Sequence, residues 1–78
     1  MTTRVYLKSA KLLNDTPQAS DLPVERVFIN ASDVPEVWVE IESHAVPEVG
    51  KAASFALVRS LDLGFRRITG TVERRITK

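Results

Sequence analysis

Hydrophobic and polar positions alternate through the first half of the chain as they do in β-strands. Residues 4–13 begin with this alternation, and residues 24–31 repeat it. The clearest case is residues 37–45, where an apolar face of Val37, Val39 and Ile41 opposes a face of Trp38, Glu40, Glu42 and His44. Because successive side chains of a strand point to opposite faces, each pattern predicts a strand. The second and third are expected to pair as a short antiparallel hairpin.

A ten-residue segment, 14–23, separates the first two strands and predicts a loop. It is rich in Asn, Asp, Ser, Thr and Pro, whose side chains bond their own backbone or remove a backbone donor. Loops of this length in a small domain are either functional or mobile.

The pattern changes at Pro47, where apolar residues recur at helical spacing. At about 100° per residue, most apolar side chains of residues 49–63 fall on one alanine-rich face. Pro47 suits the first position of a helix, and Gly64 suits the residue just past its end. We therefore expect an amphipathic helix over residues 47–63. Phe55 and Val58 lie on its polar side, where either a neighbouring loop or a second chain would cover them.

Residues 65–76 form the last expected strand, with Ile68, Val72 and Ile76 on its inner side. Gly70 falls on the same side, which indicates a bulge or a close approach by the helix. The element order is therefore β-β-β-α-β. It predicts one α+β domain over residues 1–78, in which an amphipathic helix packs on a four-stranded antiparallel or mixed sheet.

Length and composition limit how such a domain is stabilised. A chain of 78 residues buries only roughly 60% of its unfolded surface, so its core is marginal. It has no cysteine for disulfides, and one histidine is too few for a zinc site. Association remains, so we expect a homo-oligomer or a bound protein partner, and no cofactor or metal. No segment is long and apolar enough to span a membrane, and no signal peptide is evident, which predicts a cytoplasmic protein.

Candidate catalytic groups are sparse. His44 lies beside Glu42 on one strand face, an arrangement that suits a general base, but no motif places a serine or cysteine nucleophile near it. The three glycines fit neither a Walker loop nor a dinucleotide fingerprint. We therefore expect a protein that is not an enzyme and has no small-molecule substrate.

Charge is distributed unevenly along the chain. Residues 1–48 hold four basic and eight acidic side chains, whereas residues 49–78 hold seven basic and two acidic ones. The last strand carries two arginine doublets about 26 Å apart, a spacing that suits phosphate contacts. Nucleic-acid binding is therefore the alternative function, through Arg66, Arg67, Arg74 and Arg75. If the third and fourth strands are neighbours, or nearly so, however, Glu40 and Glu42 can pair with Arg67 and Arg75 and neutralise this row.

The sequence favours protein binding. Trp38 lies on the outer face of the clearest strand, flanked by Glu40 and Glu42. Tryptophan and arginine are enriched in interface hot spots. The alternative for Trp38 is that the long loop or the first strand covers it. We expect an accessory or inhibitor module, of the kind that phages and mobile elements encode, acting through the outer sheet face or through Phe55 and Val58.

Overall fold

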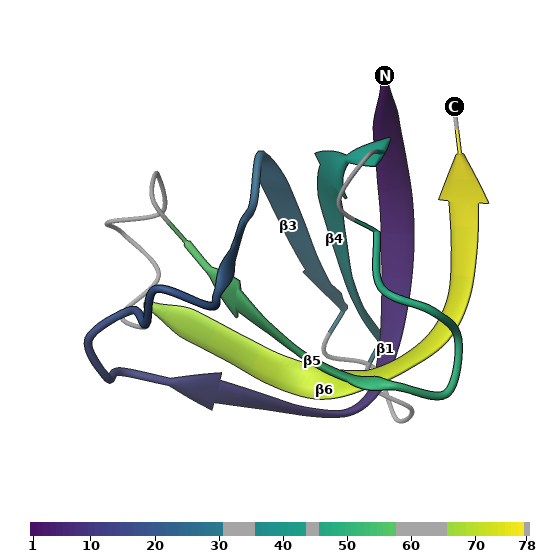
Figure 1. Cartoon of the computed structure of the whole chain (residues 1–78). Helices are drawn as coiled ribbons and strands as arrows, with labels where there is room; N and C mark the ends of the chain where they lie inside the picture. Colours follow the sequence, from purple (N-terminus) through teal and green to yellow (C-terminus); the bar gives the residue numbers. More distant parts are fainter. Residues whose placement is uncertain (31–35, 44–45, 58–65, 78) are drawn as a thin grey trace.

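The computed structural model shows one curled sheet of six strands (Figure 1). It describes residues 1–30, 36–43, 46–57 and 66–77. The strands are β1 (Thr2–Leu13), β2 (Leu22–Pro23), β3 (Arg26–Asn30), β4 (Glu36–Glu42), β5 (Ala52–Ala56) and β6 (Arg67–Thr77). Their order across the sheet is β2-β5-β6-β1-β4-β3. All neighbours are antiparallel except β2 and β5, which are parallel.

The predicted α+β class is wrong. Strands make up 68% of the described residues, which contain no helix. The error lies in residues 47–63, because Ala52–Ala56 forms β5 rather than part of a helix. Gly64, the expected helix end, lies outside the described residues. Alanine is a good helix former, but the free-energy preference per residue is small. Here the pairing of all of β5 with β6 and the burial of Phe55 outweigh it.

The four strands expected from alternation are confirmed, with small changes at their ends. They correspond to β1, β3, β4 and β6. The hairpin is confirmed as well, since β3 pairs antiparallel with β4. The segment 14–23, expected as loop, ends in the two-residue strand β2.

The central strands β1 and β6 bend and divide the sheet into two halves (Figure 1). Their pairing contains two register shifts. At one of them, between Lys8 and Lys11, two residues of β1 correspond to the single Gly70 of β6, and the first of the two, Ser9, adopts a left-handed conformation with φ of 55°. A Cβ atom on Gly70 would lie 3.2 Å from Cβ of Leu7 and 3.4 Å from Cα of Ala10. The predicted bulge is confirmed, although β1 and not a helix approaches the glycine.

We name the two parts by their strands. The β3–β4 half contains β3 and β4 with residues 2–8 of β1 and 74–77 of β6; the β5–β6 half contains β2 and β5 with residues 9–13 of β1 and 67–72 of β6. Apolar side chains from both halves meet inside the curl and form one core. Its buried members are Val5, Leu7, Val24, Val37, Val39, Ile41, Phe55, Leu57, Ile68 and Val72.

The two edge strands of the sheet are consecutive in the chain. Only Val24 and Glu25 separate β2 from β3. The N–H of Val24 donates to the carbonyl of Ala56 at 3.1 Å, and the N–H of Glu25 donates to the carbonyl of Glu40 at 2.9 Å. This short connection spans the two halves and gives the sheet the shape of a half-barrel. Among the described strands, β3 pairs only with β4, so its other edge is free.

Candidate functional site

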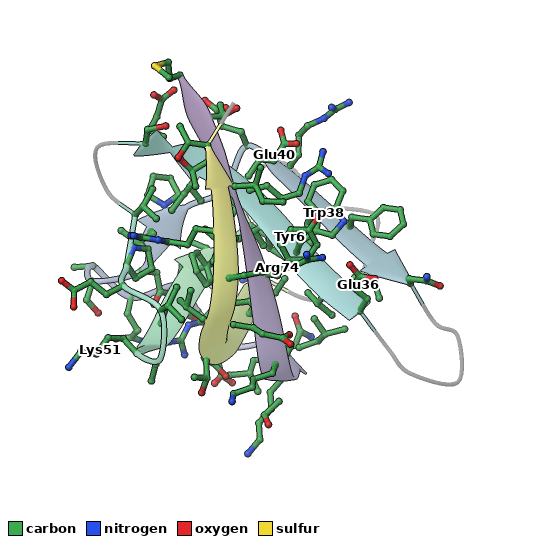
Figure 2. All side chains as sticks on the ribbon, turned by 90° about the vertical axis from the view of Figure 1, so that its right-hand side faces the viewer. Tyr6, Glu36, Trp38, Glu40, Lys51 and Arg74 are labelled. Atoms are coloured by element: carbon green, nitrogen blue, oxygen red, sulfur yellow. The ribbon has the colours of Figure 1, made fainter. Side chains whose placement is uncertain are left out.

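The outer face of the β3–β4 half carries four large side chains in a line across four strands. Arg74 lies opposite Tyr6, Tyr6 opposite Trp38, and Trp38 opposite Phe28. Because residues opposite each other in antiparallel strands share a face, these side chains form one row, which we call the aromatic row. Figure 2 shows Arg74, Tyr6 and Trp38 together on this face, flanked by Glu40 and Glu36.

The members of the aromatic row are in contact. The Arg74 guanidinium lies 4.0 Å from the centroid of the Tyr6 ring. The rings of Tyr6 and Trp38 are tilted with centroids 6.4 Å apart, whereas Trp38 and Phe28 are stacked at 5.1 Å with planes 11° apart. These offset geometries are the favourable ones for aromatic pairs. The row therefore holds its rings in fixed positions before anything binds.

Among the three rings of the row, exposure increases toward the edge strand β3. Tyr6 is only 8% exposed, Trp38 is half-buried, and Phe28 is 45% exposed. The first strand does partly cover Trp38, as one interpretation of the sequence proposed, through Tyr6 and Arg4. Phe28, on the edge strand β3, is thus the most exposed ring of the row.

Arg4 fixes the position of Trp38. Its guanidinium lies 4.0 Å from the centroid of the Trp38 ring, and its Nη2 donates to Oε1 of Glu40 at 3.3 Å. Glu40 is only 6% exposed. A hydrogen bond to the Tyr6 hydroxyl and the one to Glu40 raise the pKa of Arg4, against the effect of burial. Arg4 therefore stays a cation, as its position over an aromatic ring requires.

The pairing of Glu40 and Glu42 with Arg67 and Arg75, which depends on strand order, is not the arrangement in the structure. Strand β1 lies between β4 and β6, so the acidic residues of β4 face β1 instead. Glu40 pairs with Arg4. The exposed Glu42 lies 4.0 Å from the N-terminal amine.

The four arginines of the C-terminal region do not form one row. Arg67 binds both carboxylate oxygens of Asp21, at 2.8 and 3.2 Å. Arg74 covers Tyr6, and Arg75 donates to the backbone carbonyl of Pro47 at 3.1 Å. Arg66 is exposed just before β6. Because β6 bends and each of these arginines contacts a different partner, their side chains do not share one surface.

The charge pattern of the sequence does not identify Asp21 as the partner of Arg67. Burial raises the pKa of its carboxyl group, but hydrogen bonds from Arg67 and from the backbone N–H of Gln18 lower it more, so that the pKa lies below its usual value. Asp15 adds a longer contact to Arg67 at 3.8 Å. Both aspartates lie in the segment expected as loop, where no pattern indicates which strand they face.

Of the second predicted contact surface, only Phe55 lies within the described residues, and it is not exposed. Phe55 is fully buried in the core, because it lies on β5 and faces inward. Val58 and His44 lie outside the residues that the structure describes. Of the residues predicted for a protein interface, the structure places Trp38, Glu40 and Glu42 together on the outer face of the β3–β4 half.

The outer face of the β5–β6 half differs in kind. Small residues lie opposite one another there, Ala52 against Thr71 and Ser54 against Thr69. Beside these small residues lies an open groove of about 570 Å³. Its border includes Ser9, Lys11, Ser20, Leu22 and Pro47. Within the described part of the chain, no cluster of His, Cys, Asp and Glu suits a metal ion. The same residues include no helix that is long and apolar enough to cross a membrane.

Three members of the site are not identified by the sequence patterns. Tyr6, Phe28 and Arg4 become part of it through contacts between strands. Alternation along β3 places Phe28 on the face opposite Val27 and Ile29, and that signal is present in the sequence. The partners of Tyr6 depend on strand order, which no local pattern gives.

Comparison with known proteins identifies no relative that shares this site. A scan against protein-family models, a search of curated proteins and a search of solved structures found no match to this chain.

Proposed function

We propose that this protein is a non-enzymatic protein-binding module that acts through the outer face of its β3–β4 half. The observation that carries the proposal is Phe28, 45% exposed and stacked on Trp38 at the edge of the sheet. An aromatic side chain already held by a neighbour loses little conformational freedom on binding. Aromatic and arginine side chains are also those that dominate interface hot spots.

The distribution of charge supports a protein rather than a nucleic acid as partner. Two arginines of this face lie over aromatic rings, Arg4 over Trp38 and Arg74 over Tyr6, whereas Arg26 lies opposite Glu40. Stacking of bases needs open ring faces beside a continuous basic track. Here the two inner rings are already covered, and the carboxylates Glu36 and Glu40 lie on the same face.

The experiment is affinity capture from extracts of the native cell with three baits: the wild type, Phe28→Ser and Leu12→Ser. Leu12 is the matched control, since it is 43% exposed but lies in the β5–β6 half. We expect one or more proteins, or the untagged chain itself, to be retained by the wild type and Leu12→Ser. Recovery with Phe28→Ser should fall at least about tenfold, as expected for a hot-spot residue.

Equal recovery by all three baits would contradict the proposal. Circular dichroism shows that each bait is folded. Titration of the wild type with single-stranded and duplex DNA and RNA at two salt concentrations tests the alternative. Binding that weakens as salt rises would favour the nucleic-acid function instead.

A further inference from the structure

We infer that the partner of this face is a second copy of the chain, paired antiparallel through the free edge of β3. The inference rests on the proposed function and names its partner. Among the described strands, β3 pairs only with β4. Its sequence, Arg26 to Asn30, contains neither proline nor lysine, the residues that commonly protect such an edge.

Backbone geometry restricts the register of this pairing. The N–H and C=O groups of alternate residues point to the same edge of a strand, and the side chains of alternate residues share a face. Two copies of β3 can therefore pair only when both partners are even-numbered or both odd-numbered. The register centred on Phe28 meets this condition and uses all five residues of the strand.

In this register the side chains of the two copies match on both faces. On the outer face Phe28 lies opposite the partner's Phe28, which joins the two aromatic rows into one. On the inner face Ile29, which is 36% exposed, lies opposite the partner's Val27 and extends the core. A register shifted by two residues instead places Glu25 opposite the partner's Ile29, or Phe28 opposite the partner's Asn30.

Charge complementarity supports the same register. Arg26 lies opposite the partner's Asn30, and Asn30 lies beside Glu36 on β4. Arg26 and the partner's Glu36 are then two strand spacings apart, about 10 Å between Cα atoms. Both side chains are long and exposed, so they can meet above the intervening asparagine. Two-fold symmetry makes the contact twice, once at each end of the paired strands.

The first test is sedimentation of the purified full chain between about 10 µM and 1 mM. A pairing of two five-residue strands buries little surface, so the dimer is expected to be weak and concentration-dependent. Emission from Trp38, the single tryptophan of the chain, should change over the same concentration range. A wild type that stays monomeric at 1 mM would overturn the inference.

Two charge variants test the register. In homodimers of Arg26→Glu, and equally of Glu36→Arg, both contacts join like charges, and association should weaken about tenfold. In a mixed dimer of the two variants, both contacts again join opposite charges. We therefore expect the equimolar mixture to associate like the wild type while each variant alone does not. A structural defect in either variant would not be repaired by mixing, so failure of the mixture overturns this register.

A third variant tests the centre of the pairing. Phe28→Glu places two carboxylates at the two-fold axis and should abolish the dimer, whereas Leu12→Glu should leave it intact. The outcomes separate the inference from the proposed function. A monomeric wild type whose cellular capture of another protein still depends on Phe28 overturns only the inference. A monomeric wild type with no such capture overturns both.

Discussion

The two halves of the sheet share β1 and β6, but their outer faces carry different kinds of side chain. In the β3–β4 half the face is filled by Arg74, Tyr6, Trp38 and Phe28, which touch one another in register. In the β5–β6 half the corresponding positions hold Ala, Ser and Thr, and the face is hollow. Both halves bury apolar residues on the inside. The difference therefore lies in the kind of side chain on each outer face: one carries rings that contact one another, whereas the other carries small residues and the exposed Lys11 beside the groove.

The largest expected effect contrasts two phenylalanines. Phe55 of the β5–β6 half is fully buried, whereas Phe28 of the β3–β4 half is 45% exposed. Phe55→Ala leaves a cavity in the core and should lower the free energy of unfolding by about 3–5 kcal/mol. Phe28→Ala loses chiefly its stacking on Trp38, about 0.5–1.5 kcal/mol. Urea denaturation followed by circular dichroism at low protein concentration measures both.

The contrast fails if the two variants lose similar stability. Such a result would mean that Phe28 stabilises the core of the monomer and is not available as a contact residue. A small effect of Phe28→Ala on stability, together with a large effect of Phe28→Ser on capture, is the pattern expected of an interface residue.

The second comparison is between the ion pairs of the two halves. In the β5–β6 half Arg67 binds Asp21 through two hydrogen bonds, and the Asp21 side chain is fully buried. Asp21→Asn removes the charge and should cost about 1.5–3 kcal/mol at neutral pH. Asp15→Asn is the control, because Asp15 is exposed and contacts Arg67 only at 3.8 Å, so its loss should cost less than about 1 kcal/mol.

This pair also predicts a pH dependence. The pKa of Asp21 is lowered in the folded state, so the carboxylate binds fewer protons there than in the unfolded chain. Its contribution to stability is therefore complete above the unfolded pKa of about 4 and is lost as the pH falls through the folded value. Asp21→Asn should therefore lose less stability than the wild type as the pH falls from about 5 into the acid range. Parallel curves for the two proteins would contradict this role.

The strands and the core follow from sequence more readily than the site does. Alternation in residues 37–45 predicts which face of β4 is buried, and Val37, Val39 and Ile41 are indeed in the core. The same rule fails at Ile76, which was expected inside with Ile68 and Val72 but is exposed. A register shift between β1 and β6 adds one residue to β6 there, and a shift of one residue exchanges the two faces of a strand.

The aromatic row depends on contacts that are distant in sequence. The hairpin alone suffices to bring Phe28 opposite Trp38, so this part was within reach of the sequence. Tyr6 meets Trp38 and Arg74 only because β1 lies between β4 and β6, and that order arises from packing of the whole sheet. The expected helix also prevented a correct prediction of strand order. With residues 52–56 assigned to a helix, β5 was missing from the sheet and β6 lacked its second neighbour.

The smallest expected effect concerns how Arg4 holds the outer face of the β3–β4 half. Arg4→Lys keeps the cation beside Glu40 but removes the flat guanidinium that covers the Trp38 ring. We expect little change in stability and a red shift of Trp38 emission, because water reaches the uncovered ring. Arg26→Lys is the control, since Arg26 is exposed and lies opposite Glu40 rather than Trp38. Identical emission from the two variants would mean that Phe28 and Tyr6 alone order Trp38, and that the arginine contributes only its charge.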